Sequence, residues 1–356
     1  MSRRRWVLTP IACALFAAAS LSWSPVIAGQ QNQKLDKVQQ QETQAAARIA
    51  DAVAAGQPVT ADIGMSIKLD SVKALNSLTR VPFVLSLDPA QVPASKAITL
   101  YLRLVARTPV PAAAPAAASA GARPAAAAPA APEFAFQGAH FIDLKAPAPG
   151  EPYRVTRAFS VPAGDYDLYV IVKDRAPVRK GDKSPQKAGF LKQVITVPDL
   201  WGGGLTTSSV ILIQETKILD RPLTAEQEDE QPYTFGMNAV VPASGTRFSR
   251  KSELAATFYI YNTAQDRGKK PDIAVEYGFY QRTPDKGEKF FNKTQTQMFN
   301  AASLPAAFDA DIHALRVVQS VPLAPFPEGE YRLEIKVTDK LSGSVITRNI
   351  PFSVVP

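Results

Sequence analysis

Cysteine is almost absent from this sequence of 356 residues: Cys13 is the single copy, and it lies in an apolar stretch near the N-terminus. If that stretch is removed on export, no thiol is left for a disulfide bond or for a cysteine-bound metal. Cys13 is not expected to carry a lipid, because Pro10, Ile11 and Ala12 before it lack the leucine that is usual three places earlier. Stability must therefore come from hydrophobic cores, and the chain is long enough to form two.

Histidine is nearly as rare, with His140 and His313 as the two copies. Both lie in segments that we expect to be strands, and no GxSxG or HExxH pattern places a nucleophile or a second metal ligand beside them. Asp309 and Asp311 precede His313, but a calcium loop supplies more oxygen ligands and usually a glycine at its turn. We expect no catalytic residue, no metal and no cofactor, although a pair of carboxylates facing each other across a cleft stays open as an alternative.

The sequence also lacks a clustered lysine and arginine stripe with interleaved aromatic residues, which is typical of proteins that bind nucleic acid. Its net charge of +8 falls to +5 if residues 1–28 are removed, because they contain three basic residues and no acidic one. We therefore expect no nucleic-acid partner. This mild positive charge leaves room for weak attraction to anionic polymers of the cell surface.

The first 28 residues have the form of an export signal. Basic Arg3–Arg5 precede the apolar stretch Trp6–Leu21, and we expect cleavage after Ala28. The apolar stretch is short for a membrane span of about 20 apolar residues, so we expect no stable span after cleavage. Residues Ser2–Leu8 also fit the twin-arginine pattern, which leaves the general and the twin-arginine routes open. The mature protein is expected in the bacterial periplasm or outside the cell.

Residues 29–58 are predicted to form a helical leader that ends at Gly56 and Pro58. Its apolar residues fall on one helical stripe: Leu35, Val38, Ala45, Ile49 and Ala52. One interpretation is a short coiled-coil or docking helix, and the other is a partly frayed leader before the first domain. We favour the frayed leader, because the stripe covers fewer than four heptads.

Residues 59–218 are predicted to form a first β-sandwich domain, because short apolar runs alternate with polar residues and are separated by Pro, Gly, Asp and Asn. Residues 109–132 interrupt this pattern with an almost pure Ala and Pro sequence, which we interpret as a disordered loop inside the domain. Residues 61–108 alone supply only three strands, too few for a sandwich. The expected strands are 63–70, 80–87, 97–106, 134–143, 153–160, 166–174, 189–197 and 207–216.

Residues 233–356 are predicted to form a second sandwich, and the acidic residues 219–232 before it are expected to be a solvated linker. The expected strands of the second domain are 235–241, 253–262, 272–282, 288–299, 313–321, 330–339 and 344–354. Seven strands in about 120 residues match an immunoglobulin-like sandwich. The predicted fold is therefore all-β, with two immunoglobulin-like β-sandwich domains and a short N-terminal helix.

One sequence phrase occurs twice at a constant offset of 165 residues, which indicates a duplicated domain. Pro162, Gly164, Asp165, Tyr166, Leu168, Val170, Val172 and Asp174 recur as Pro327, Gly329, Glu330, Tyr331, Leu333, Ile335, Val337 and Asp339. Proline and glycine suit a turn at the sandwich edge, and the residues after them alternate as in a strand. Tyr166 and Tyr331 are therefore predicted to be tyrosine corners, in which a buried ring bonds through its hydroxyl to upstream backbone.

Three segments also resemble a known group of proteins. FPEGEYRLEIKVTDKLSGSVITRNIPFSV (Phe326–Val354), RVPFVLSLDP (Arg80–Pro89) and VPDLWGGGLTTSSVIL (Val197–Leu212) are similar to immunoglobulin-like or fibronectin-III-like modules of uncharacterised secreted bacterial proteins. Such modules occur with von Willebrand A or GWxTD domains. The resemblance implies a sandwich fold and export. It implies no ligand, because the chain contains neither the Asp-x-Ser-x-Ser metal pattern nor a GWxTD sequence.

One strand suggests a binding face. Alternation places Tyr259 and Tyr261 on the side opposite Phe258 and Ile260, and Tyr280 is expected to lie beside them as part of an exposed aromatic face. Exposed tyrosines suit protein contact or stacking on a glycan. The leading hypothesis is a non-enzymatic exported protein that contacts a protein partner at the cell envelope as an adaptor or surface component. The alternative is a carbohydrate-binding accessory protein that uses this face.

Overall fold

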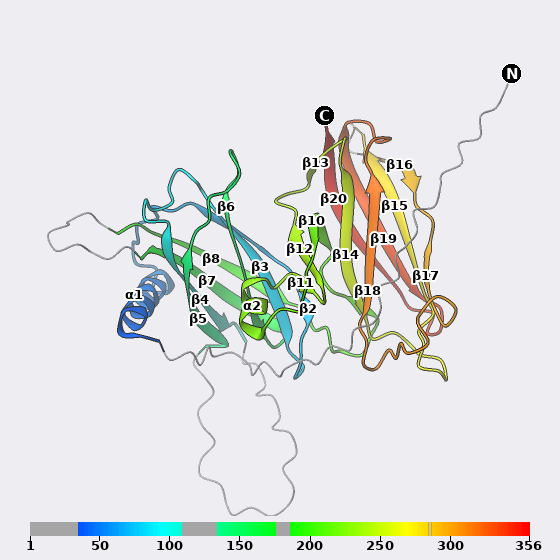
Figure 1. Cartoon of the computed structure of the whole chain (residues 1–356), viewed down its shortest axis with the longest axis horizontal. Coiled ribbons are helices and arrows are strands. Elements are labelled where there is room, and N and C mark those ends of the chain that lie inside the picture. Colours follow the sequence, from blue (N-terminus) through cyan, green and yellow to red (C-terminus); the bar gives the residue numbers. More distant parts are fainter. Residues whose placement is uncertain (1–34, 109–133, 176–185, 284, 286) are drawn as a thin grey trace, which may run out of the picture.

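The computed structural model describes residues 35–108, 134–175, 186–283, 285 and 287–356. The expected export signal (1–28) and the Ala/Pro-rich loop (109–132) lie outside the described residues. Two β-sandwiches lie side by side, and helix α1 packs on the side of the first sandwich that faces away from the second (Figure 1). The fold is all-β, as predicted, with two immunoglobulin-like sandwiches and a short N-terminal helix. Neither helix in the described ranges has the length and apolar character of a membrane span.

The first sandwich consists of two four-stranded sheets packed face to face. One sheet has β3 (Thr79–Leu87) at its centre, paired with β1 (Met65–Leu69), β2 (Val72–Lys73) and β6 (Tyr153–Val161). The other sheet has the order β5 (Phe136–Asp143), β4 (Ala97–Ala106), β7 (Gly164–Asp174) and β8 (Ala188–Val197). Their inward side chains, such as Phe83, Leu102 and Val170, form one buried core.

The second sandwich has two six-stranded sheets. One has the order β11 (Thr234–Phe235), β12 (Asn238–Pro242), β10 (Ile211–Ile218), β14 (Glu253–Tyr261) and β18 (Leu315–Pro322), with β9 (Thr206–Thr207) also paired to β14. The other has the order β13 (Arg247–Ser249), β20 (Val345–Val355), β19 (Gly329–Asp339), β15 (Ile273–Arg282) and β16 (Glu288–Lys293), with β17 (Gln297–Phe299) also paired to β15. The core between them is rich in aromatic rings, including Phe279, Phe326 and Phe352.

The two sandwiches repeat one strand arrangement. Strands β1, β3, β4, β6, β7 and β8 correspond in order and in pairing to β10, β14, β15, β18, β19 and β20. The register agrees too, because Ile98 pairs with Asp174 in the first domain and Ile273 pairs with Asp339 in the second. The repeated sequence phrase therefore lies in equivalent strands of a duplicated domain.

Both copies of the phrase adopt the corner geometry. Tyr166 and Tyr331 are fully buried, and each hydroxyl donates a 2.8 Å hydrogen bond to the carbonyl oxygen of the proline four residues earlier, Pro162 and Pro327 respectively. The φ angle of Gly164 is 153°, which L side chains rarely adopt, so the turn before the tyrosine needs glycine. The two tyrosines tie the start of β7 and of β19 to the preceding turn.

The boundary between the domains differs from the prediction. Strands β9 and β10 pair with β14, and β10 also pairs with β12, so they belong to the second sandwich. The sequence assigned 207–216 to the first domain because a strand pattern shows which residues alternate but not which strand they pair with. The second domain therefore begins at Thr206, and the first ends with β8 and the segment that follows it.

Helix α1 (Lys37–Ala54) is docked, so the preferred interpretation of a partly frayed leader is wrong over this range. It starts with a capping box, in which Asp36 Oδ1 accepts a 2.8 Å hydrogen bond from the backbone nitrogen of Gln39. The helix packs on the outer face of the β4–β7 sheet, against Tyr101, Tyr169 and Ile171. Its own buried residues are Ala46, Ala50 and Val53.

Two ion pairs hold the same helix in place. Glu42 pairs with Lys173 at 2.9 Å, and Asp51 pairs with Arg103, whose side chain is buried. Val38, which was expected on the apolar stripe, is instead 63% exposed. Small alanines allow the helix to approach the sheet closely. A search for hydrophobic periodicity gives alanine little weight because its side chain has little apolar surface, so it does not show which alanines are buried.

Candidate functional site

The junction between the two sandwiches contains its own apolar cluster, separate from both cores. Val84 points outward from β3 of the first domain and packs against Ile211, Ile213, Tyr233 and Val240 of the second. All five side chains are buried. Burial of this apolar surface stabilises the contact between the domains, so the two sandwiches form one unit.

A buried polar pair lies beside this cluster. Tyr233 Oη donates a 2.8 Å hydrogen bond to Oδ2 of Asp70, and both side chains are almost fully buried. Burial raises the pKa of the Asp70 carboxyl, while Lys68 and the tyrosine hydroxyl act in the opposite direction. The pKa of Tyr233 is raised by burial and by the charge of Asp70, so its hydroxyl stays protonated and remains a donor.

The acidic segment between the domains, predicted to be a solvated linker, is largely exposed but also contacts the first domain. Residues Ala225–Glu230 form helix α2, which lies against β6 of the first domain. Asp229 pairs with Arg80 at 3.5 Å, and Glu230 pairs with Arg157 at 3.4 Å. The acidic residues thus meet cations of the first domain, and a charge run alone does not reveal that its counter-charges lie about 70 to 150 residues earlier in the chain.

A lysine and a tryptophan lie at the end of the junction that is formed by β2. Nζ of Lys73 in β2 lies 4.0 Å from the ring centroid of Trp201 and donates a 2.9 Å hydrogen bond to Asn262 Oδ1. The backbone nitrogen of Lys73 donates to Tyr261 Oη at 3.1 Å. Burial lowers the pKa of Lys73, and the charge of Asp199 partly offsets this. Trp201 itself keeps 39% of its surface exposed.

The expected exposed tyrosine face does not form. Tyr259 and Tyr261 share the outer face of β14, as alternation predicted, but Tyr261 is buried at the domain junction. Tyr259 is half-buried, stacked on Tyr261 with 6.0 Å between ring centroids, and covered at its edge by Phe235. Tyr280 lies on β15, in the other sheet of the sandwich, where it contacts Arg332. The neighbouring domain and β11 cover a face that the sequence left to solvent.

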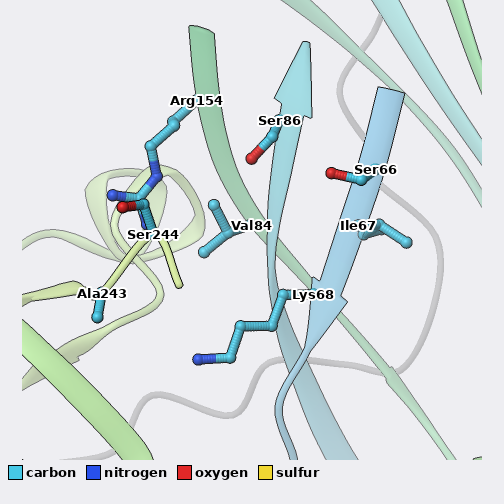
Figure 2. A pocket seen from close by; sticks show the side chains of 8 residues that line it. All are labelled: Ser66, Ile67, Lys68, Val84, Ser86, Arg154, Ala243 and Ser244. Atoms are coloured by element: carbon cyan, nitrogen blue, oxygen red, sulfur yellow. The ribbon is translucent and has the colours of Figure 1, made fainter. Parts of the chain in front are cut away.

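A small hollow of about 100 Å³ lies at the junction, between β1, β3 and β6 of the first domain and the segment that follows β12 of the second. Figure 2 shows Val84 between the side chains of Arg154 and Lys68. Arg154 Nη2 donates a 2.7 Å hydrogen bond to the carbonyl oxygen of Pro242, so its guanidinium already has a role in joining the domains. The volume suits a few water molecules and is well below that of common ligand pockets.

A larger pocket of about 280 Å³ lies where the first domain approaches β9 and β20. Its walls carry the hydroxyl side chains of Ser71, Thr206, Thr207, Ser208 and Ser209. Arg348 of β20 also lines it and donates a 2.9 Å hydrogen bond from Nε to Thr207 Oγ1. No salt bridge joins Arg348 to a carboxylate of the residues that the structure describes.

The pocket borders an open strand edge. Strand β20 pairs along its length with β19, but on its other side β13 pairs only with Ser353–Val355. Among the described strands, none pairs with the remainder of this edge from Val345 to Phe352. An unpaired edge presents backbone donors and acceptors to a further strand. We define this edge and the adjoining 280 Å³ pocket as the β20 groove.

Sequence reasoning did not single out Arg348, although a signal was there. In β20 the inward register contains Ile346, Arg348, Ile350 and Phe352, so one charged residue interrupts an otherwise apolar series. A lone arginine in the apolar register of a strand indicates either a buried partner or a pocket. Here it reaches the pocket at the edge of the sandwich.

The two histidines do not line this groove, and they differ in environment. His140 is buried with no hydrogen-bond partner for Nε2, and burial together with the charge of Arg157 lowers its pKa to about 3. It is therefore neutral and shielded from solvent at physiological pH. Nδ1 of His313 accepts a 2.9 Å hydrogen bond from the backbone nitrogen of Asp309, which fixes the ring at a turn.

Asp309 and Asp311 pair with a lysine. Lys269 Nζ lies 3.2 Å from Asp309 Oδ2 and 2.9 Å from Asp311 Oδ2, so its positive charge occupies the space between the two carboxylates. No group of three or more His, Cys, Asp or Glu side chains that could hold a metal ion occurs in the described part of the chain.

Comparison with known proteins gives low similarity to solved structures. No protein-family model and no curated protein matches this sequence. An immunoglobulin-like protein from Pseudomonas aeruginosa has 13% identity to it, with 41% of this chain and 97% of that one covered and a TM-score of 0.19. The α2-macroglobulin of Salmonella has 11% identity, with 84% of this chain but only 17% of that protein covered and a TM-score of 0.22. The fold assignment therefore rests on the strand order and the two tyrosine corners, and neither neighbour points to a von Willebrand A or GWxTD domain.

Proposed function

We propose that this chain is an exported, non-enzymatic bacterial protein that acts through protein contact, as an adaptor or envelope component in the periplasm or outside the cell. The observation that carries the proposal is the β20 groove, a strand edge that no described strand pairs with, beside a polar pocket to which both domains contribute. Extended segments of other proteins bind to such edges through backbone hydrogen bonds, while adjoining pockets select side chains.

The junction supports this proposal, because it gives the two domains a defined relative position. Its apolar cluster, the Tyr233–Asp70 pair and the docked helix α2 all connect the first sandwich to the second. Ser71 and Leu200 of the first domain can therefore form a stable wall of a pocket whose other walls belong to the second. A protein-binding groove benefits from such preorganisation, since less ordering is needed on binding.

Protein contact is favoured over the alternative of carbohydrate binding. The alternative relied on Tyr259, Tyr261 and Tyr280 as one exposed platform, whereas two of them face the domain junction and the third lies on the other sheet. The proposal of a non-enzymatic role is supported by the histidines, since His140 is buried in its neutral form and His313 is engaged by backbone.

Site-specific photo-crosslinking in the exporting cell tests the proposal. A photo-reactive residue would replace Thr347, which is exposed on β20, and in a matched strain it would replace exposed Lys289 on β16. We expect discrete protein adducts from position 347 that are absent from position 289 and that disappear when Arg348→Glu is added. Adducts with polysaccharide alone, or no adduct at either position, would contradict the proposal.

A further inference from the structure

We infer that the β20 groove binds an extended segment of a partner protein with the pattern apolar–x–acidic–x–apolar, whose acidic side chain pairs with Arg348. This inference rests on the proposed function and specifies the chemistry of the partner. It follows from the direction of the backbone groups, from the side chains that face the groove, and from the charge of the pocket.

The backbone of β20 presents hydrogen-bonding groups at the groove that no described strand pairs with, although the carbonyl oxygen of Thr347 also accepts a 3.4 Å hydrogen bond from Arg348 Nη1. The backbone nitrogen of Ser353 donates a 2.8 Å hydrogen bond to the carbonyl oxygen of Thr246, so the polar groups of Ser353 point away from β19. Backbone polar groups alternate in direction along a strand, and the β19–β20 register is continuous, so Thr347 and Asn349 point the same way. An added strand can therefore bond to these two residues.

The groove also has a defined end toward the C-terminus. Pro351 is the next residue after Thr347 and Asn349 whose backbone faces the open edge, but proline has no backbone N–H to donate. Beyond it, Ser353–Val355 already pair with β13. The stretch that is open to a partner strand is therefore short, from Val345 to about Ile350, and it accommodates a segment of about five residues.

The side chains of β20 that face the groove determine the pattern. Ile346, Arg348 and Ile350 lie on the inward face of the strand, all three half-buried, and the two isoleucines pack against the core of the second domain. Directly opposed residues of paired strands place their side chains on the same face. A partner strand therefore presents apolar side chains opposite Ile346 and Ile350 and an acidic one opposite Arg348, with any residue between them.

The pocket fits a single carboxylate side chain. Its volume of about 280 Å³ is at the lower limit for ligand pockets, and it is bordered by hydroxyl groups of both domains. Arg348 uses Nε on Thr207 and Nη1 on the carbonyl oxygen of Thr347, which leaves Nη2 with no hydrogen-bond partner among the described residues. A carboxylate entering the pocket meets this guanidinium together with hydroxyl donors, and charge-assisted hydrogen bonds of this kind are strong.

Selection from a displayed library of random nine-residue peptides on the immobilised chain without residues 1–28 tests the inference. We expect enriched peptides with an acidic residue flanked, two places away on each side, by apolar residues. Arg348→Glu should weaken the binding of a selected peptide about tenfold or more, and a new selection on this variant should enrich lysine or arginine at the central position. Thr347→Pro should also weaken binding, since it removes one backbone donor of the free edge.

The control is Arg267→Glu, which reverses an exposed arginine of the same domain in the loop between β14 and β15. It should leave peptide binding and the thermal unfolding midpoint unchanged, and the Arg348 and Thr347 variants should keep that midpoint within a few degrees. Selected peptides without an acidic centre, or equal binding by the Arg348→Glu variant, would overturn the inference. So would a dimer of the free chain that dissociates on Thr347→Pro, because a second copy would then occupy the edge.

The two proposals fail differently. Protein adducts at position 347 combined with a library that enriches no acidic pattern would overturn the partner chemistry while leaving protein contact intact. No protein adducts at position 347 in the exporting cell would overturn the proposed function, whatever the library yields.

Discussion

Tyr233 and Asp70 form a buried hydrogen bond of 2.8 Å between the two domains, although 163 residues separate them in the sequence. Tyr233 belongs to the start of the second sandwich, and Asp70 lies between β1 and β2 of the first. The carboxylate has little access to water, so the hydroxyl replaces part of its lost solvation. This pair is directional and makes the relative position of the domains specific, whereas the apolar cluster beside it stabilises their contact by burying apolar surface.

Replacing Tyr233 with phenylalanine should lower the free energy of unfolding by about 1–3 kcal/mol, because Asp70 then remains buried without its donor. Tyr153→Phe is the matched control: Tyr153 is also buried, but its hydroxyl forms no hydrogen bond within the described part of the chain. Urea denaturation monitored by circular dichroism measures both variants. Equal losses in the two would mean that the Tyr233 hydroxyl contributes nothing specific.

The tyrosine corners should contribute equally to their two domains. Tyr166→Phe and Tyr331→Phe each remove one 2.8 Å hydrogen bond to a proline carbonyl while keeping the buried ring, so each should cost about 1 kcal/mol of unfolding free energy. Denaturant titration of the two single variants measures this. A variant that keeps its stability but no longer gives crosslinks from position 347 would instead assign a binding role to that tyrosine.

Strand positions were predictable from the sequence to within a few residues, because the alternation of apolar and polar residues along a strand is a local property. The phrase around Tyr166 and Tyr331 also revealed the duplication, since a corner requires proline, glycine and tyrosine at fixed spacing. Pairing partners were not predictable in the same way. Strand β10 alternates like any other strand, and only the three-dimensional structure assigns it to β12 and β14.

A local sequence pattern also does not show what a strand packs against, which explains why the exposed tyrosine face was predicted wrongly. Alternation correctly placed Tyr259 and Tyr261 on the face opposite Phe258, but a pattern of period two cannot distinguish a face that meets water from one that meets another domain. Arg348 could have been noticed as a charge in an apolar register. The pocket that it lines depends on Ser71 and Leu200, which belong to the other domain and which no local pattern connects to it.

Acidification should destabilise the first domain through His140. The pKa of this buried imidazole is lowered from 6.5 to about 3 in the folded protein, mainly by burial. As the pH falls below about 6.5, the unfolded chain binds a proton that the folded chain does not, so the equilibrium moves toward unfolding. Between pH 7.5 and pH 5 the free energy of unfolding should fall by about 2 kcal/mol from this group alone, at 1.36 kcal/mol per pH unit.

The His140→Leu variant isolates this contribution. The difference in unfolding free energy between the wild type and the variant, measured by urea denaturation at several pH values, should change by about 2 kcal/mol over that range. Asp70 has the opposite dependence, because its raised pKa favours the folded state as the pH falls, but it is common to both proteins and cancels. A difference that does not vary with pH would mean that His140 is protonated in the folded state.

Overpacking should loosen the docked helix. Ala50 is fully buried where α1 approaches the sheet, so Ala50→Leu should cost about 1–3 kcal/mol, whereas Ala54→Leu adds the same side chain at an exposed position near the helix end. The rate of tryptic cleavage after Arg48, measured by mass spectrometry, should rise in the first variant and stay unchanged in the second. Cleavage at the same rate in the wild type and both variants would contradict the tight packing of α1.

Separation of the domains can be followed with one tryptophan, because a chain without residues 1–28 contains only Trp201, which lies at the junction. Val84→Lys places a third positive charge beside Arg154 and Lys68, in the apolar cluster between the domains but outside both cores. An unpaired buried charge destabilises such a contact by more than the apolar side chain stabilised it. We expect the fluorescence emission of Trp201 to shift to longer wavelength while the far-ultraviolet circular dichroism of the sheets is retained. Val318→Lys, at an exposed position of β18, should change neither signal. Loss of both signals together in Val84→Lys would show that the first sandwich cannot fold without its neighbour, and an unchanged emission would mean that the cluster does not hold the domains together.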